Sequence, residues 1–294
     1  MNLQCWLNET SKKLELADVQ TARLDTLILL EDITGKERGW LLAHPDFALQ
    51  RSDLRKLNAW IQRRALHEPL AYIRGKSEFY GREFYVTADT LQPRPETETM
   101  ITLLKNLLEH KSLVSKVEPW KVVDVGTGSG CLAVTAKLEL TDLEVYATDI
   151  NVAALKIARK NAHKLHADVT LLKGNLLEPF SKLQDPSSKI AQIILANLPY
   201  VPNDHTINQS AMHEPSIAIF GGKDGLDLYR EMFEQVKEYG GRKALGEGGR
   251  PEYIFTESLP FQHEELAKIA EVHGYKQTAQ EDFIQVFKLV HGLS

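Results

Sequence analysis

Cysteine is scarce in this 294-residue sequence, which contains only Cys5 and Cys131. The two lie far apart and outside any spacing typical of metal ligands, so the sequence predicts neither a disulfide framework nor a zinc site. We expect both to be small buried apolar groups. The ten histidines form no ligand-like set either, and His163 and His166 are interpreted as a surface pair. The sequence therefore predicts no metal site.

Long apolar runs are also missing. The longest candidates, Leu27–Leu30 and Ile193–Ala196, fall far short of the roughly 18 residues needed to cross a bilayer, so no membrane partner is expected. Met1–Thr10 has neither a basic region followed by an apolar stretch nor the Arg-rich, acid-poor pattern of a transit peptide. These features favour a cytoplasmic protein.

A strong excess of positive charge is absent, because 35 Lys and Arg face 40 Asp and Glu, for a net charge of -5. Stable attachment to nucleic acid phosphates is therefore not expected. Residues 51–82 differ, with eight basic against three acidic side chains. A solvated helix face is one interpretation of this stretch, and a surface that guides an acidic protein partner is the other. The basic residues are Arg51, Arg55, Lys56, Arg63, Arg64, Arg74, Lys76 and Arg82.

The composition that is present, 43% hydrophobic and 26% charged, is ordinary for a globular protein long enough for a large and a small domain. We predict a helical domain at 1–76, a hairpin linker at 77–92 and a larger domain at 93–294. Helical spacing supports the first domain at Leu24, Leu27, Ile28 and Glu31, ending near Gly35, and at Leu54, Leu57, Ile61 and Ala65, behind Ser52 and Asp53. Phe79, Tyr80, Phe84, Tyr85 and Val86 flank a predicted turn at Gly81-Arg82.

The remainder alternates strand-like and helix-like stretches, which predicts an α/β domain with a mainly parallel sheet and helices on both faces. Such sheets bind ligands at the carboxyl ends of their strands. The predicted strands are 121–125, 144–148, 169–172, 192–196, 253–257 and 282–289, and the clearest helices are 131–139 and 152–165.

A glycine-rich turn, Gly126-Thr127-Gly128-Ser129-Gly130, joins the first of these strands to a helix. Glycines allow a tight turn and let a ligand approach bare backbone amides. Asp149 ends the next strand 19 positions after Gly130, where an acidic side chain accepts hydrogen bonds from a ribose diol. The spacing matches neither a dinucleotide fingerprint nor a P-loop, so an adenosyl ligand without a pyrophosphate fits better.

A second motif, Asn197-Leu198-Pro199-Tyr200, follows the apolar strand that ends at Ala196. An Asn side-chain oxygen and the carbonyl of residue 198 can accept the two N–H groups of an amide or amine. Pro199 favours an extended conformation at the preceding residue, which directs that carbonyl out of the strand end. Tyr200 can stack on a flat acceptor group while its hydroxyl stays in water.

With these motifs the sequence resembles the HemK-like family of protein-(glutamine-N5) methyltransferases, which modify the Gly-Gly-Gln loop of peptide-chain release factors. The resemblance implies a Rossmann-like S-adenosylmethionine-dependent methyltransferase domain whose last strand is antiparallel, a small N-terminal helical substrate-recognition domain, and a connecting β-hairpin. The matching segments are Glu68–Gly75, Glu78–Gly81, Pro93–Glu98, the glycine loop, Asn197–Tyr200, Glu214-Pro215, Gly221–Leu226, and Glu257 with Gln262. The sequence departs from the family at Leu198, where Pro is usual, at Asn175, where Asp is usual, and after Asp282, where an Arg is usual.

The resemblance also implies roles for individual residues. Asn197 and Tyr200 are the expected catalytic residues, and Leu198, Pro199, Arg94 and Glu96 join them in binding the acceptor. For Arg94 and Glu96 an interdomain salt bridge is the competing interpretation. The expected S-adenosylmethionine-binding residues are Gly126, Thr127, Gly128, Ser129, Gly130, Asp149, Asn175, Leu176 and Asn197.

Two other functions are open at this stage. An adenine-N6 methyltransferase acting on RNA or DNA would present the same planar nitrogen to Tyr200. A non-catalytic adapter would keep the fold and bind a translation factor without transferring a methyl group. The acidic net charge counts against the first, and methyl transfer to any acceptor would exclude the second.

Overall fold

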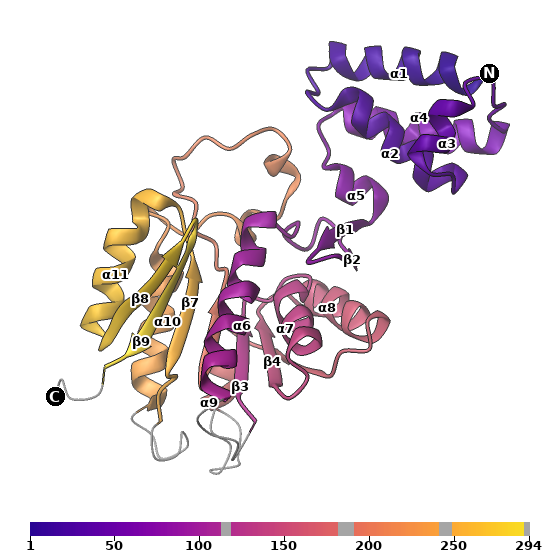
Figure 1. The fold of residues 1–294 in the computed structure, drawn as a ribbon. Helices are drawn as coiled ribbons and strands as arrows, with labels where there is room; N and C mark the ends of the chain where they lie inside the picture. The colour runs from indigo at the N-terminus through magenta and orange to yellow at the C-terminus, as the bar shows by residue number, and fades with distance from the viewer. Residues whose placement is uncertain (113–118, 182–190, 241–248, 291–294) are drawn as a thin grey trace. The chain divides into compact units, whose positions relative to one another are not determined.

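The computed structural model describes residues 1–112, 119–181, 191–240 and 249–290 (Figure 1). Contacts divide the chain into two compact units. The first comprises residues 1–76 and 207–213, and the second comprises residues 77–206 and 214–294. None of the described helices is both long enough and apolar enough to span a membrane.

The first unit is helical, and a leucine-rich core holds its helices together. The helix that contains Leu27 ends as predicted at Gly35, whose φ of 64° allows the left-handed cap that stops the helix. The helix that contains Leu57 begins at Arg51, one residue ahead of the predicted start signal Ser52, with Gln50 as its N-cap. The helices are α1 (Leu3–Leu16), α2 (Ala22–Thr34), α3 (Arg38–Ala43), α4 (Arg51–Ala65) and α5 (Leu70–Arg74).

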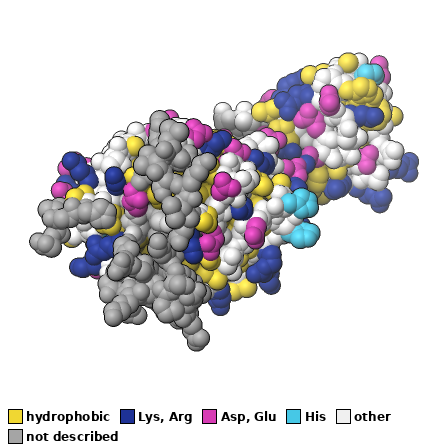
Figure 2. Space-filling model, turned by 60° about the horizontal axis from the view of Figure 1, so that its bottom comes forward, with side chains coloured by type: hydrophobic (Ala, Val, Ile, Leu, Met, Phe, Trp, Pro, Cys, Tyr) yellow, Lys and Arg dark blue, Asp and Glu magenta, His cyan; other side chains and the backbone are white. Residues whose placement is uncertain are grey.

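Within the basic stretch 51–82, Arg51, Arg55 and Lys56 are exposed on α4, whereas other basic side chains form ion pairs. A solvated face and a docking surface both stay predictions. Five of its side chains pair with carboxylates inside their own unit, and Arg64, which reaches Asp25 at 2.6 Å, is only 12% exposed. Apart from Glu68, these carboxylates lie outside the stretch, so counting charges within it could not reveal most of the pairing. The other pairs are Arg63–Glu68, Arg74–Asp32, Lys76–Asp32 and Arg82–Glu139. Figure 2 shows dark blue and magenta side chains interspersed over the face it presents.

The second unit opens with a hairpin of β1 (Lys76–Phe79) and β2 (Arg82–Tyr85), whose first residue, Lys76, is the last residue of segment 1–76 of the first unit. Its turn is Tyr80-Gly81, one residue earlier than predicted, because both residues have positive φ, 50° and 71°, as a two-residue hairpin turn requires. Buried Asn161 anchors the hairpin, since it bonds to both the N–H and the C=O of Tyr85.

A seven-stranded sheet follows, in the order β5-β4-β3-β6-β7-β9-β8. Strands β3 to β7 are parallel, and β9 runs antiparallel to β7, so the expected α/β fold with an antiparallel last strand is confirmed. The strands are β3 (Lys121–Val125), β4 (Glu144–Asp149), β5 (Val169–Lys173), β6 (Ile193–Ala196), β7 (Tyr253–Glu257), β8 (Tyr275–Glu281) and β9 (Ile284–Leu289).

The predictions near the C-terminus missed β8 and began the following strand too early. Most side chains of β8 are exposed at the sheet edge, so they carry no alternating apolar pattern. Asp282 belongs to the turn between β8 and β9, with φ of 49°.

Helices cover both faces of the sheet. One apolar core packs α6 (Glu98–Ser112), α7 (Cys131–Glu139) and α8 (Val152–Lys164) on the sheet, and a second packs α9 (Glu178–Ser181), α10 (Asp227–Gly240) and α11 (His263–Val272) on the opposite face. Short 3-10 helices are η1 (Pro95–Thr97), η2 (Ala211–His213), η3 (Ser216–Ala218) and η5 (Pro260–Gln262). The expectation for the cysteines was wrong at Cys5, which is exposed, whereas Cys131 is partly buried at the start of α7.

Candidate active site

A cavity of about 190 Å³ lies at the carboxyl ends of β3, β4 and β6, within the second unit. It brings together most of the residues selected from the sequence: Gly126, Thr127, Gly128, Ser129, Asp149, Asn175, Leu176, Asn197, Leu198, Pro199 and Arg94. Gly130, Glu96 and Tyr200 do not line it. Residues 89–93 line it as well, together with Pro215, Ile217 and Ala218, although the sequence analysis gave none of them a role in the site.

Backbone geometry explains the glycine loop. Gly126, Gly128 and Gly130 have φ of 72°, 55° and 81°, values that residues with a Cβ rarely adopt. The amides of Gly126 and Thr127 both donate to the Thr148 carbonyl at 2.9 Å, which ties the loop to the end of β4. A Cβ on Gly130 would lie 3.0 Å from Cβ of Ala158. Gly130 therefore permits close packing on α8, and it does not line the cavity.

Asp149, at the end of β4, holds the glycine loop through a hydrogen bond. Its Oδ2 accepts the Gly128 N–H at 2.8 Å and its Oδ1 accepts the Asn151 N–H at 2.7 Å. Burial raises the pKa of this carboxyl, and the backbone N–H donors offset part of that rise. Each oxygen retains a lone pair for a second donor such as a ribose hydroxyl. The next residue, Ile150, is 53% exposed and adds an apolar wall to the cavity.

Asp124 lines the cavity but was not among the selected residues. Its Oδ2 accepts from the Thr127 hydroxyl at 2.5 Å and from the Ala133 N–H at 3.1 Å. Burial raises the pKa of the Asp124 carboxyl to about 7. An acidic residue inside the apolar run of β3 was the signal in the sequence, because a buried carboxyl needs a structural or functional reason.

Asn197 extends from the end of β6 with its side-chain amide fixed by a buried hydroxyl. Asn197 Nδ2 donates to Thr97 Oγ1 at 3.0 Å, and Thr97 Oγ1 donates to Glu257 Oε2 at 2.6 Å. Thr97 and Glu257 are 2% and 1% exposed. Burial raises the pKa of the Glu257 carboxyl, although the donated hydrogen bonds offset part of the effect.

The Tyr200 hydroxyl does not stay in water as expected. It donates to Glu257 Oε1 at 3.1 Å, and burial raises the pKa of the phenol. Glu257 thus joins Tyr200 and, through Thr97, Asn197, although sequence reasoning had given Glu257 no role. Tyr200 does not line the cavity, and its stacking on an acceptor stays a prediction.

Leu198 occupies the position where the family resemblance predicts proline. Its N–H donates to the Tyr229 hydroxyl at 3.3 Å, and that hydroxyl donates to the Glu257 carbonyl at 2.5 Å. A Cβ on Gly126 would lie 3.1 Å from Cδ2 of Leu198, so this side chain packs on the glycine loop.

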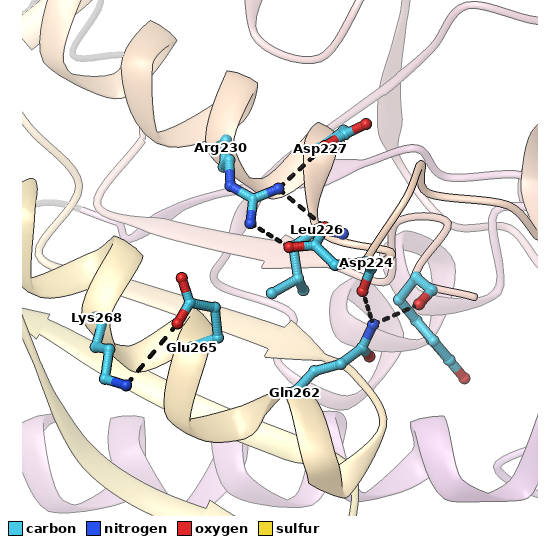
Figure 3. Close-up of polar contacts among 8 residues, drawn as sticks. Asp224, Leu226, Asp227, Arg230, Gln262, Glu265 and Lys268 are labelled. Atoms are coloured by element: carbon cyan, nitrogen blue, oxygen red, sulfur yellow. Dashed lines mark hydrogen bonds and ion pairs between the residues drawn. The ribbon is translucent and has the colours of Figure 1, made fainter. Parts of the chain in front are cut away.

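The segment Gly221–Leu226 packs against the Asn197–Tyr200 motif, and Gln262 links the two. Gln262 Nε2 donates to the carbonyls of Tyr200 and Asp224, each at 2.7 Å, and Figure 3 shows Gln262 reaching toward Asp224. Arg230 holds the Asp224 carboxylate in turn. A Cβ on Gly225 would lie 2.0 Å from the Tyr200 carbonyl oxygen, so the two loops touch backbone to backbone.

The remaining predicted residues occupy different positions. Arg94 Nη2 contacts both carboxylate oxygens of Glu214 at 2.8 Å. Because both residues belong to the second unit, the interdomain salt bridge considered from the sequence is wrong for Arg94. Glu96 is exposed outside the cavity. The Asn175 amide donates to Glu231 on α10.

Comparisons with known proteins match both units. Residues 5–75 match the family model described as PrmC N-terminal domain, and residues 95–200 match Ribosomal protein L11 methyltransferase (PrmA). The chain is 41% identical to the release factor glutamine methyltransferase of Bacillus subtilis (strain 168), over 71% of this chain and 72% of that protein. It is 36% identical to the release factor glutamine methyltransferase of Koribacter versatilis (strain Ellin345), over 81% and 82% of the two chains.

Among solved structures, the chain resembles the hMettl16 catalytic domain in complex with MAT2A 3'UTR hairpin 1. The TM-score is 0.53 at 12% identity, covering 84% of this chain and 83% of that one. This similarity supports the methyltransferase fold alone.

Proposed function

The chain belongs to the release factor glutamine methyltransferase family, and from this membership together with the cavity geometry we propose how its residues act. It is an S-adenosylmethionine-dependent enzyme that methylates a glutamine side-chain amide of a translation release factor. We propose that the acceptor is the glutamine of the Gly-Gly-Gln motif and that the reaction takes place in the cytoplasm. We also propose residues 1–76 as the substrate-recognition domain, 77–92 as the hairpin linker and 93–294 as the methyltransferase domain.

The residues around the cavity fit an adenosyl ligand. The position of a Cβ on Gly128 has no atom within 4 Å, so bare backbone faces open space there. Asp149 offers carboxylate lone pairs for a ribose diol, and half-exposed Ile150 offers apolar surface beside it. We propose that Gly126, Thr127, Gly128, Ser129, Asp149, Asn175, Leu176 and Asn197 hold the cofactor, with Gly130 shaping the loop from behind. When bound, S-adenosylmethionine supplies an electrophilic methyl group on a sulfonium sulfur.

Orientation of the acceptor nitrogen is the task of the protein residues. An amide nitrogen is a poor nucleophile because its lone pair is delocalised into the carbonyl. Asn197 Oδ1 and the Leu198 carbonyl are proposed to accept the two amide hydrogens, which holds the nitrogen in line with the methyl group. Pro199 and Arg94 shape the acceptor side of the cavity, while Tyr200 supports the loop through Glu257. The observation that carries this proposal is that Asn197 donates its amide N–H to Thr97, which leaves its oxygen as the free acceptor.

Incubation with methyl-labelled cofactor and separate samples of release factor, rRNA and DNA tests the proposed function. We expect label on the release factor, and no label when the Gly-Gly-Gln glutamine is replaced by glutamate. Asp149→Ala is the cofactor-site control, and its cofactor affinity should fall by roughly tenfold or more because charge-assisted hydrogen bonds are lost. Label on adenine of rRNA or DNA would identify a nucleic acid methyltransferase, and cofactor binding without transfer would identify an adapter.

A further inference from the structure

A buried relay lies behind Asn197 and joins three separate elements. Glu257 comes from the end of β7, Thr97 from η1, and Asn197 from the end of β6. Thr97 Oγ1 lies 2.6 Å from Glu257 Oε2 and 3.0 Å from Asn197 Nδ2. Thr97 and Asn197 both line the cavity, whereas Glu257 does not. The relay therefore connects a carboxylate outside the cavity to the amide that faces it.

The chemistry of the hydroxyl determines the direction of the relay. A threonine hydroxyl has one proton, and the Glu257 carboxylate accepts it. The Thr97 oxygen can then only accept a hydrogen bond from Asn197, so the Asn197 NH₂ group must face Thr97. A reversed amide would place Asn197 Oδ1 against Thr97 Oγ1 with no proton between the two oxygens. Only one orientation of the Asn197 amide is compatible with this arrangement.

We propose that Glu257 and Thr97 are positioning residues that hold the Asn197 amide with its oxygen toward the acceptor, and so select an acceptor that donates N–H over one that presents a carboxylate. The inference rests on the proposed function, because the acceptor is taken to be a glutamine amide. Tyr200 supports the same state, since its hydroxyl donates to the other oxygen of Glu257 at 3.1 Å. Two hydroxyl donors stabilise the ionised carboxylate, and the ionised form cannot donate a proton back to Thr97.

Thr97→Val tests the relay because valine keeps the shape of threonine and removes its hydroxyl. We expect turnover to fall on the order of a hundredfold, with a smaller loss of cofactor affinity because Asn197 is also a proposed cofactor contact. Thr97→Ser should recover turnover to within roughly tenfold of the natural protein. Thr102→Val is the matched control on the exposed side of α6, and it should change neither quantity.

The preference of the protein for a glutamine over a glutamate acceptor shows whether Thr97 positions Asn197 or only stabilises the fold. The readout is the ratio of affinities for a release factor carrying Gly-Gly-Gln and one carrying Gly-Gly-Glu. In the natural protein the glutamine form should bind at least roughly tenfold more tightly, and in Thr97→Val the ratio should fall below about threefold, because the freed amide can turn its NH₂ group outward. An unchanged ratio in Thr97→Val overturns the proposal.

A double-mutant cycle tests the place of Glu257 in the same relay. Glu257→Gln alone should lower turnover by roughly tenfold or more, yet should lower it by less than about twofold when Thr97 is already Val. Fully additive losses would show that Glu257 acts independently of Thr97, which contradicts the relay.

Hydrogen exchange provides a readout that needs no acceptor. The Asn197 side-chain amide protons can be identified in NMR spectra by their absence from Asn197→Asp, and they should exchange at least roughly tenfold faster in Thr97→Val than in the natural protein. Equal exchange rates would overturn the relay whatever the substrate is. Slow exchange in a natural protein that fails to methylate release factor would instead refute the proposed function alone.

Discussion

Asn197 and Leu198 are adjacent residues that contribute different parts of themselves to the proposed acceptor site. Asn197 offers a side-chain oxygen, whereas Leu198 offers its backbone carbonyl and directs its side chain onto the glycine loop. The Leu198 N–H donates to Tyr229, an interaction that a proline at this position would lack. Substituting these neighbours should therefore have unequal effects.

Leu198→Pro and Asn197→Ala provide that comparison. Leu198→Pro keeps the carbonyl and loses one N–H bond of about 1 kcal/mol, so kcat/KM on a release factor should stay within roughly tenfold. Asn197→Ala removes an acceptor of the substrate amide, and turnover should fall on the order of a hundredfold or more. Steady-state kinetics with release factor, together with calorimetry of cofactor binding, measures both effects. Full activity in Asn197→Ala would mean that the motif is not the acceptor site.

Two loops at the carboxyl edge of the sheet depend on each other. Segment Asn197–Tyr200 follows β6, and the glycine-containing segment Gly221–Leu226 packs behind it with Gln262 bridging the two. Gly225 has φ of 82°, and the space for its Cβ is already occupied by the Tyr200 carbonyl. The second loop thus sets the position of the first through backbone contact.

Gly225→Ala should displace the Asn197–Tyr200 loop. The substitution combines a left-handed backbone with a steric clash, so we expect a stability loss of about 2 kcal/mol or more and a fall in turnover on the order of a hundredfold. Chemical denaturation and kinetics with release factor measure these quantities. Gly39→Ala is the matched control, because Gly39 is exposed with nothing within 4 Å of an added Cβ. If Gly225→Ala were as mild as the control, the loops would be independent.

At the scale of the molecule, the second unit contains several carboxyls whose pKa burial raises. Asp124, Asp149, Glu214 and Glu257 belong to this group. A carboxyl with a raised folded pKa binds its proton more tightly in the native state than in the unfolded state. Its contribution to folding is most favourable below its ordinary pKa, and it is lost progressively as pH rises through the folded value. Each of these groups therefore makes the protein less stable toward alkaline pH.

Asp124→Asn should isolate the contribution of one of these carboxyls. The pKa of Asp124 rises from 3.8 to about 7, so ionisation of this group should lower the free energy of unfolding by on the order of 4 kcal/mol between pH 4 and pH 8. The variant removes this term, and its Tm relative to the natural protein should rise as pH increases from 5 to 8. Thermal denaturation across that range measures the difference, with Asp46→Asn on an exposed carboxylate as control. A Tm difference independent of pH would contradict the buried, titrating carboxyl.

Much of the fold follows from local patterns, because periodicity and chain punctuation act over a few residues. The bounds of β3, β7 and α7 match the predicted 121–125, 253–257 and 131–139. Local patterns did not predict features that depend on the position of a segment in the folded protein. The strand β8 is polar because it lies at the sheet edge. Four of the eight basic side chains in the stretch 51–82 pair with carboxylates outside it, namely Asp25, Asp32 and Glu139.

By itself, the sequence determined the α/β order of elements, the glycine loop with Asp149, and the Asn197–Tyr200 motif. Each of these features depends on residues that lie close together along the chain. Only the tertiary structure showed which residues hold the Asn197 side chain in place. Thr97 lies 100 positions from Asn197, and Glu257 lies 160 positions from Thr97, yet hydrogen bonds join the three. Hydrogen bonds act over about 3 Å in space and are indifferent to separation along the chain. Folding therefore had to place the ends of β6 and β7 side by side before these residues could act together.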